Sequence, residues 1–355
     1  MADFIRNAWY AGARANELGE GFLARRLLDR PVLFWRTEQG DPVAMLDRCP
    51  HRFASLHTGR RIGDQVECIY HGLRFDAAGR CTRSPYSETP PANAIVATFP
   101  VVERHGMLWI WMGDAERADP ATIPDHVFCD RAELRPIFGH ETFQGNWQLG
   151  NDNLMELTHL FFLHTSTIGG YKPDAGPVPG EEYVVRQVGG QVHSHTGTPS
   201  VPNKAPIDMG VDPVAHPVID RWNDIVWESP SNMRFAMCAT PAGGSRDVAP
   251  YMYQSHLITP ETKRSSHYFW NVARTFELTP EGDAKYLHFF GNIFRTEDAP
   301  MIEDIQEQMA EADLWEMKPV VLPRDRGAVL VRRLVARALA AEEGSAGPLE
   351  AVAAE

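Results

Sequence analysis

The chain has 355 residues, 43% of them hydrophobic and 23% charged, which excludes a disordered or fibrous protein and predicts two or three globular domains. Aspartate and glutamate outnumber lysine and arginine by 47 to 34, for a net charge of −13, so nucleic acid and anionic membrane surfaces are poor partners. The five cysteines are an odd number in a long chain, which favours metal sites in a reducing cytoplasm over a disulfide framework. We find no signal-peptide pattern and no apolar run of about 20 residues, and therefore expect a cytoplasmic protein without a membrane segment.

The N-terminal part of the chain alternates short apolar runs with turn signals rich in Gly, Asp and Pro. Runs of this length and spacing are typical of β-strands. The predicted strands are residues 31–35, 42–46, 66–70 and 107–111. The pattern indicates a small, mostly antiparallel β domain, and the polar segment 113–124 is the best candidate for a linker.

The pattern changes after this linker candidate. Residues 147–163 are largely apolar, with one glycine and no proline, and predict a helix. Gly189-Gly190 marks a two-residue hairpin turn, because glycine accepts the positive φ that such turns need. Further strands are predicted at residues 183–188, 191–196, 225–227, 233–239, 252–258 and 267–273, and helices at residues 300–312 and 327–343. We therefore expect a second domain of antiparallel strands and a few helices, which makes the fold class α+β.

Two short segments combine cysteine and histidine at the spacing of metal ligands. Cys49 and His51 are separated by one residue, and Cys68 follows after sixteen more, three positions before His71. Two thiolates and two imidazoles suit either tetrahedral zinc or a [2Fe–2S] cluster with two cysteines on one iron and two histidines on the other. The spacing favours the cluster, because each segment then supplies one ligand to each iron, whereas a zinc knuckle usually keeps two cysteines together.

A second constellation lies in and just after the predicted helix 147–163. Glu156 and His159 are three residues apart and therefore neighbours on one helical face. His159 and His164 are five apart, which separates them by about 140° on an ideal helix. Both can bind one metal only if the helix ends, kinks or widens between them. For this segment alone, a buried amphipathic helix with two hydrogen-bonded histidines is an equally good interpretation.

The two cysteine segments together, with the Tyr-His-Gly ending of the second, resemble the Rieske signature. A Rieske signature followed by Asn-Leu-Met-Glu-Leu-Thr-His at residues 153–159 and by His164 resembles the oxygenase subunits of Rieske non-haem iron oxygenases. The chain is most similar to the vanillate O-demethylase type of this family. Residues 268–270 and 296–298 add to the likeness, which runs over nearly the whole chain.

This resemblance implies an N-terminal all-β Rieske domain at residues 1–115 and a catalytic domain at residues 116–343. The catalytic domain would be helix-grip-like, an antiparallel sheet with helices, and residues 344–355 would form a disordered tail. The four Cys and His residues named above would hold the [2Fe–2S] Rieske cluster.

The resemblance also implies that His159, His164 and Asp298 hold a mononuclear Fe(II), with Glu297 as the neighbouring alternative to Asp298. Two histidines and one carboxylate leave iron positions open for dioxygen and substrate. Asn153 would lie near this iron. Glu156 would connect, across the interface of a homotrimer, to a Rieske histidine of the neighbouring subunit.

The implied activity is that of the oxygenase component of a Rieske monooxygenase in aromatic catabolism. It would O-demethylate a methoxylated aromatic acid with O2 and release formaldehyde. Electrons would come from NADH through a separate reductase that carries flavin and its own iron–sulfur centre. No Gly-x-Gly-x-x-Gly fingerprint occurs in the chain, which favours an external reductase.

Candidate substrate-pocket residues lie on the predicted strands of the second domain: Asn232, Arg234 and His256. An arginine that faces the pocket would favour an aromatic carboxylate. One alternative is a Rieske oxygenase that hydroxylates a ring or removes an N-methyl group. Another is a Rieske electron carrier with a ligand-binding domain, which would have no need of the open iron site.

Overall fold

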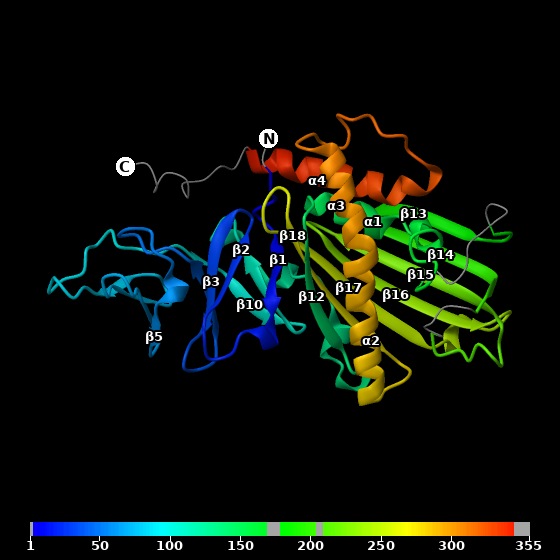
Figure 1. Ribbon diagram of the computed structural model, residues 1–355, viewed down its shortest axis with the longest axis horizontal. Helices are drawn as coiled ribbons and strands as arrows, with labels where there is room; N and C mark the ends of the chain where they lie inside the picture. Colours follow the sequence, from blue (N-terminus) through cyan, green and yellow to red (C-terminus); the bar gives the residue numbers. More distant parts are fainter. Residues whose placement is uncertain (1–2, 169–177, 204–208, 344–355) are drawn as a thin grey trace. The chain divides into compact units, whose positions relative to one another are not determined.

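A computed structural model describes residues 3–168, 178–203 and 209–343 of the chain. It contains two compact units (Figure 1): Met1–Ile123 with Thr259–Lys263 and Ala341–Glu355, and Pro124–Ile258 with Arg264–Ala340. The domain boundaries that the sequence suggests, 1–115 and 116–343, stay predictions, and the expected disordered tail lies outside the described residues. Among the described residues, we find no helix with the length and apolar character needed to cross a membrane.

The first unit consists of three small antiparallel sheets. Their orders are β1-β11-β10, β2-β3-β4-β9 and β5-β6-β7-β8. The strands are β1 (Trp9–Arg14), β2 (Leu23–Leu27), β3 (Arg30–Arg36), β4 (Pro42–Leu46), β5 (Arg60–Ile62), β6 (Gln65–Glu67), β7 (Arg74–Asp76), β8 (Cys81–Arg83), β9 (Thr98–Phe99), β10 (Val101–Arg104) and β11 (Met107–Trp111). Three of the four predicted strands correspond to β3, β4 and β11, whereas the fourth ends at Glu67 instead of Tyr70, because the chain turns at Cys68.

Both cysteines of the predicted cluster site belong to the core of this unit. Cys49 and Cys68 are buried together with Trp35, Leu56 and Phe75. The first cysteine follows the end of β4, and the second lies in the connection between β6 and β7. Two different sheets therefore deliver the two cysteine segments to one apolar cluster.

The second unit is built on a seven-stranded sheet with the order β12-β18-β17-β16-β15-β14-β13. The strands are β12 (Ile137–Phe143), β13 (Glu182–Val188), β14 (Gln191–Pro202), β15 (Val218–Glu228), β16 (Asn232–Pro241), β17 (Tyr251–Pro260) and β18 (Ser266–Arg274). All six predicted strands are present and most are longer than predicted. Gly189, with φ of +57°, forms the two-residue turn between β13 and β14.

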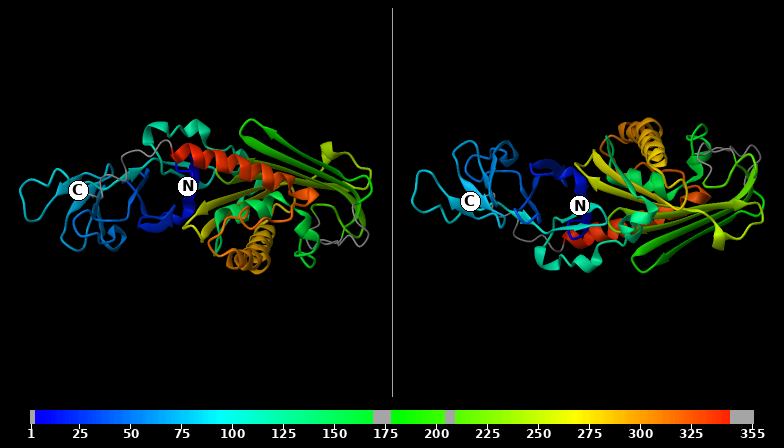
Figure 2. Two further views of the ribbon diagram at one scale, coloured as in Figure 1. Left: turned by 90° about the horizontal axis from the view of Figure 1, so that it is seen from above. Right: turned by 90° about the horizontal axis from the view of Figure 1, so that it is seen from below.

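In the described part of the chain, four α-helices accompany the sheet: α1 (Trp147–Met155), α2 (Pro280–Ile293), α3 (Ala299–Met309) and α4 (Arg326–Glu343). α2 and α3 continue into one another along one face of the sheet through a π-helical turn, Phe294–Asp298 (Figures 1 and 2). The sequence did not indicate α2, although it carries ordinary start signals: the Thr279 hydroxyl accepts the Gly282 N–H, and Pro280 is the first helical residue. An ion pair of 2.5 Å between Arg332 and Asp152 ties α4 to α1.

The predicted helix over residues 147–163 is wrong in its second half. α1 ends at Met155, and Glu156 is extended, with φ of −126° and ψ of 104°. The Glu156 carboxylate accepts the Thr158 N–H at 2.7 Å, so a side chain takes the donor that the helix would have used. A 3₁₀ turn, Thr158–Phe161, follows. Glu156 and His159 are consequently not neighbours on a helix, and His159 and His164 are free of the 140° separation that a continuous helix would impose.

Candidate metal centres

The two cysteine segments adopt the same backbone turn. The Cys49 N–H donates to the Ala54 carbonyl at 2.8 Å, and its carbonyl accepts the Phe53 N–H at 2.9 Å. Cys68 makes the same two hydrogen bonds. Its N–H donates to the carbonyl of the residue five positions later at 2.8 Å, and its carbonyl accepts the N–H of the residue four positions later at 2.9 Å. The fourth residue after each cysteine has a left-handed backbone, with φ of +61° at Phe53 and +71° at Gly72. Each turn is thus closed by backbone hydrogen bonds between its own residues.

These turns place like ligands side by side. The Cys68 thiol lies beside the Cys49 thiol, and both are almost completely buried. The imidazole rings of His51 and His71 lie 4.5 Å apart between centroids. Burial, together with the neighbouring Cys68, raises the pKa of the Cys49 thiol to about 11 despite the nearby His51 N–H. A metal cluster must therefore displace a proton from this thiol. The pairing of thiol with thiol and imidazole with imidazole fits the ligand set of a Rieske cluster.

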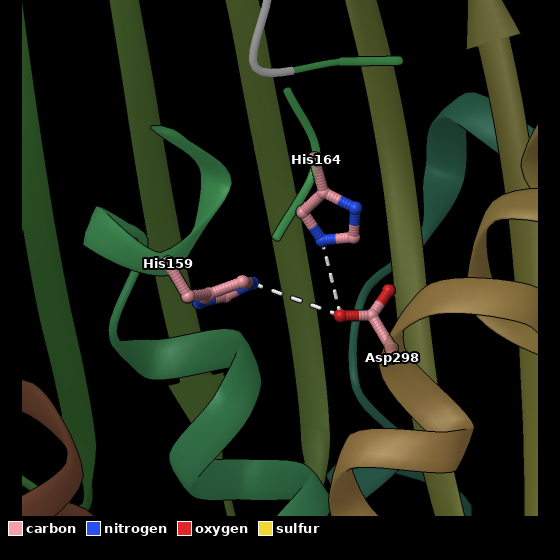
Figure 3. A group of neighbouring side chains, drawn as sticks. All are labelled: His159, His164 and Asp298. Carbon is pink, nitrogen blue, oxygen red and sulfur yellow. Dashed lines mark hydrogen bonds and ion pairs between the residues drawn. The ribbon is translucent and has the colours of Figure 1, made fainter. Parts of the chain in front are cut away.

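The second centre is formed by His159, His164 and Asp298, whose candidate ligand atoms lie within 4.8 Å of one another. Nε2 of His164 is 3.1 Å and Nε2 of His159 is 3.7 Å from the same oxygen, Asp298 Oδ1. Figure 3 shows both imidazoles pointing toward this carboxylate. His164 and Asp298 are buried, and His159 is half-buried.

Three different local structures position this trio. His159 lies in the 3₁₀ turn after α1, and His164 follows that turn. Asp298 is the last residue of the π-helical turn between α2 and α3, a distortion that often marks functional sites. Asn153, in the last turn of α1, donates from Nδ2 to Asp298 Oδ1 at 3.1 Å. Asn153 therefore lies against the carboxylate, as the sequence resemblance implied.

The far nitrogen of each histidine is held by an acceptor. His159 Nδ1 donates to the Glu156 carbonyl at 2.6 Å, and His164 Nδ1 lies 2.5 Å from Glu297 Oε2. Both Nε2 atoms are thereby left to face Asp298, an arrangement usual for metal-binding histidines. Burial alone would lower the pKa of His164, but hydrogen bonds to Asp298 and Glu297 outweigh it and raise that pKa. The two acids at 297 and 298 thus have different positions: Asp298 faces both imidazoles, and Glu297 supports one of them from behind.

This donor set fits a mononuclear iron. Two Nε2 atoms and one carboxylate oxygen converge from one side, the facial arrangement of non-haem iron oxygenases. Comparison with known proteins agrees with both centres. Residues 8–100 match the Rieske [2Fe–2S] domain family, and residues 143–341 match the family described as the vanillate O-demethylase oxygenase C-terminal domain. The chain belongs to the Rieske non-haem iron oxygenases. It is an oxygenase component of the vanillate O-demethylase type, with a [2Fe–2S] Rieske cluster and a mononuclear iron as cofactors.

Full-length relatives support this membership. The chloroacetanilide N-alkylformylase oxygenase component of Rhizorhabdus wittichii is 36% identical over 96% of this chain and 97% of its own length. The dicamba O-demethylase oxygenase component of Stenotrophomonas maltophilia is 35% identical over 93% of this chain and 96% of its own length. A crystal structure of dicamba monooxygenase bound to dicamba has a TM-score of 0.87, with 33% identity over 96% of this chain and 99% of that one. Both of these curated relatives are named as oxygenase components.

A cavity of about 150 Å³ opens beside the mononuclear site of the oxygenase. Its wall includes His159, His164 and Asp298 together with the inner face of strands β14 to β18. Apolar side chains such as Phe235, Met252 and Phe294 dominate it. An engineered apolar cavity of about this volume binds benzene, so the space suits one aromatic ring with small substituents.

The structure places the three predicted pocket residues differently. His256 lines the cavity, whereas Asn232 and Arg234 are absent from its described wall. The Arg234 guanidinium instead donates to Glu228 at 2.5 Å and to the Asp125 carbonyl at 2.9 Å. Arg234, whose direction the sequence leaves open, thus holds its guanidinium against Glu228 and is not part of the described cavity wall. Arg221, which sequence reasoning missed, does line the cavity, and it has no ion pair with any residue that the structure describes.

A hydrogen-bonded chain of polar side chains forms another part of the wall. The Tyr268 hydroxyl is 2.5 Å from His256 Nδ1, and His256 Nε2 is 2.9 Å from Gln254 Oε1. Burial lowers the pKa of His256 to about 3, so the ring is neutral, accepts from Tyr268 and donates to Gln254. Among the described residues, the Gln254 amide then donates to two methionine sulfurs, at 3.1 and 3.4 Å, which are weak acceptors.

Proposed function

We propose that this oxygenase O-demethylates a methoxylated aromatic acid, using O2 and electrons from NADH that reach it through a separate flavin and iron–sulfur reductase. The observation that carries the proposal is the position of the His159, His164 and Asp298 trio in the wall of a cavity that suits one aromatic ring. The likeness to the vanillate O-demethylase family and to an enzyme named dicamba O-demethylase supports the choice of reaction.

The overall reaction balances with these reactants. One aryl methyl ether, one O2, two electrons and two protons give the phenol, formaldehyde and one water, because hydroxylation of the methyl carbon produces a hemiacetal that collapses. Iron bound at the trio supplies the activation of dioxygen and the attack on the methyl C–H bond. The protein holds the ring beside the trio and keeps water away with an apolar wall.

Individual residues have distinct proposed roles at this site. His159, His164 and Asp298 would be the iron ligands. Asn153 would orient Asp298 through the hydrogen bond of 3.1 Å, and Glu297 would fix the ring of His164. These roles follow from contacts that leave both Nε2 atoms and Asp298 Oδ1 pointing at one volume.

Electrons would enter through the Rieske cluster held by Cys49, His51, Cys68 and His71. We propose a homotrimer in which Glu156 of one subunit connects to His71 of the next. The Glu156 carboxylate supports this role, since nearby His159 and the hydrogen bond from the Thr158 N–H outweigh burial and lower its pKa, which keeps it anionic and ready to accept a charged hydrogen bond.

The test is turnover by the iron-loaded oxygenase with NADH, a surrogate reductase and a panel of 2-, 3- and 4-methoxybenzoates. Formaldehyde and the matching hydroxybenzoate should form in equal amounts with at least one member. N-methyl compounds and ring-hydroxylation products are assayed in parallel, because the relative named N-alkylformylase makes removal of an N-substituent the second candidate. Formaldehyde from N-methyl compounds alone, or hydroxylated rings with the methoxy group intact, would replace the proposal by one of these alternatives.

A further inference from the structure

Arg221 is a cationic side chain in the wall of the cavity beside the mononuclear site. It lies in the middle of β15, where its neighbours two residues away, Ile219 and Asn223, also line the cavity. Alternate residues of a strand share one face, so the three side chains belong to the inner face of the sheet. The position directly opposite Arg221 on β14 is Thr198, another cavity residue.

The guanidinium has no anionic partner among the described residues. Within residues 3–168, 178–203 and 209–343, Arg221 has neither an ion pair nor a hydrogen bond, and burial is the cause that lowers its pKa. The other arginine of the wall is different: Arg324 pairs with Glu181 and stacks 4.2 Å above the Tyr183 ring. Arginine remains protonated under any ordinary condition. Arg221 therefore presents an unneutralised positive charge to a largely apolar cavity.

An unpaired charge in such a place is costly for the folded protein. A ligand anion would remove this cost, and it would gain strength from the low dielectric of the cavity. The net charge of the oxygenase, −13, disfavours anionic ligands at long range. A local cation is therefore needed if an anion is to enter.

The local backbone is also unusual at this position. The pairing of β14 with β15 slips between Thr198 and Val201, next to the Arg221 pair. Ser200, inside this bulge, has φ of +54°, and its N–H is held by Asp220 Oδ1 at 2.8 Å. Bulges commonly redirect side chains beside active sites. Asn223, two residues from Arg221, also lines the cavity, and its buried Oδ1 has no hydrogen-bond partner in the described part of the chain. This oxygen is a second polar group on the same part of the wall.

We propose that Arg221 binds the carboxylate of the aromatic substrate through a two-pronged ion pair and selects acids over neutral rings of the same shape. The fork of the guanidinium matches a carboxylate. The carboxylates of the metal ligand Asp298 and of nearby Glu156 both line the cavity and would repel a substrate carboxylate at that end. Arg221 lies on β15, whereas His159 lies in the 3₁₀ turn after α1 and Asp298 in the π-helical turn, so the guanidinium comes from a different element than these metal-site residues. The inference rests on the proposed function for the identity of the ring that is held.

The test measures binding apart from turnover. Calorimetric titration of the fully metal-loaded, oxidised oxygenase, without reductase, uses 3- and 4-methoxybenzoate and the matching neutral methoxybenzamides. The wild type should bind the better benzoate about ten- to hundredfold more tightly than its amide, the range expected for hydrogen bonds to charged groups. Arg221→Met should abolish this preference and leave the amide affinity unchanged. Arg221→Lys should keep part of it, because it retains the charge without the fork.

Two further measurements separate the possible outcomes. Arg234→Met, an arginine of the adjacent strand outside the cavity wall, should keep the full preference for benzoate. Arg221→Met should unfold at the same or a higher temperature, because it removes an unpaired buried charge, whereas loss of a purely structural arginine would lower that temperature. Equal binding of benzoate and amide by the wild type, or an undiminished preference in Arg221→Met, would overturn the role of Arg221. Arg221-dependent benzoate binding without formaldehyde release would retain that role and overturn the demethylation instead.

Discussion

The cysteine turns of the first unit take their ligands and closing hydrogen bonds from segments of six residues, whereas the trio of the second unit joins residues 134 positions apart. Each cysteine turn keeps its form through bonds that begin and end within it. The iron trio instead exists only while α1, the 3₁₀ turn after it and the π-helical turn are packed together. The comparison suggests that the two centres respond independently to substitution, and that the second is more sensitive to its supporting residues.

Removing one ligand from each centre tests this independence, with the largest expected effect. Cys68→Ser should abolish the visible Rieske spectrum and all NADH-driven turnover, and it should lower the iron content from about three to about one per chain. His159→Ala should retain the Rieske spectrum and about two irons, and it should also lose turnover. Iron analysis and visible spectra of both purified variants provide the measurement.

The same pair of variants can contradict the assignment. Activity near the wild-type level in His159→Ala would exclude His159 as an iron ligand. A fully loaded wild type with only two irons per chain would favour the electron carrier over the oxygenase. Loss of both centres in either single variant would show that the two centres are coupled and not independent.

Glu156 is the residue proposed to connect the mononuclear site of one subunit to the Rieske cluster of the next. Its substitution should have the next largest effect on electron transfer. Glu156→Gln should keep both metals, because the amide oxygen can still accept the Thr158 N–H that the carboxylate accepts at 2.7 Å. It should slow oxidation of the pre-reduced Rieske cluster by roughly 10- to 100-fold, since a neutral amide loses a charged hydrogen bond to the neighbouring subunit. Glu156→Asp keeps the charge and should be slowed less.

Single-turnover oxidation on addition of oxygen and substrate measures this rate. The size of each purified variant is measured in parallel, because dissociation of the proposed trimer would slow the reaction for another reason. An unchanged rate in an intact Glu156→Gln oligomer would remove Glu156 from the electron path.

The difference between the two centres also explains what the sequence could predict. The cysteine turns were recognisable because the spacing of cysteine and histidine within each segment determines a local turn. The positive φ at position 72 also agrees with the glycine that the sequence has there. The mononuclear trio was recognisable only through the family resemblance. Spacing on a continuous helix argued against a shared metal, and the end of α1 at Met155 depends on a Glu156 side chain that binds the Thr158 N–H.

The cavity was the hardest part to predict. The residues of β15 that face it include Arg221 and Asn223 as well as Ile219, so the apolar alternation that marks a half-buried strand is interrupted. Only residues 225–227 of this strand, β15 (Val218–Glu228), were predicted. Arg234 and Arg221 are each polar residues on a strand, and only the register of β15 and β16 decides which of them faces the cavity. A polar residue on the inner face of a strand is a signal of a binding site, but it can be read only when the strand pairing is known.

Substitution of Glu297 tests the contacts that support the iron ligands, and we expect it to have a smaller effect than the variants above. Its Oε2 takes hydrogen bonds from His164 Nδ1 at 2.5 Å and from the Thr167 hydroxyl at 2.7 Å. Glu297→Gln should weaken iron binding by about tenfold, at the lower end of the range for such contacts, because the amide oxygen still accepts one bond. Loss of iron during dialysis against a chelator measures it. Thr167→Val, which keeps the carboxylate, should have a smaller effect, and a Rieske spectrum altered by either variant would contradict the independence of the two centres.

The smallest predicted effect distinguishes the two cysteine turns from each other. Both need a left-handed backbone four residues after the cysteine, but Gly72 adopts it without strain and Phe53 does not. A Cβ on Gly72 would also lie 2.9 Å from Pro85 Cγ, so Gly72→Ala should destabilise its turn by about 1–2 kcal/mol. The thermal midpoint for loss of the visible cluster spectrum should then fall by roughly 3–8 °C. Phe53→Gly is the matched control: relief of the backbone strain offsets the lost contact with Arg48, whose guanidinium lies 5.4 Å from the ring centroid, and the midpoint should change little. Equal losses in the two variants would show that side-chain packing, and not the closed backbone turn, holds these ligands in place.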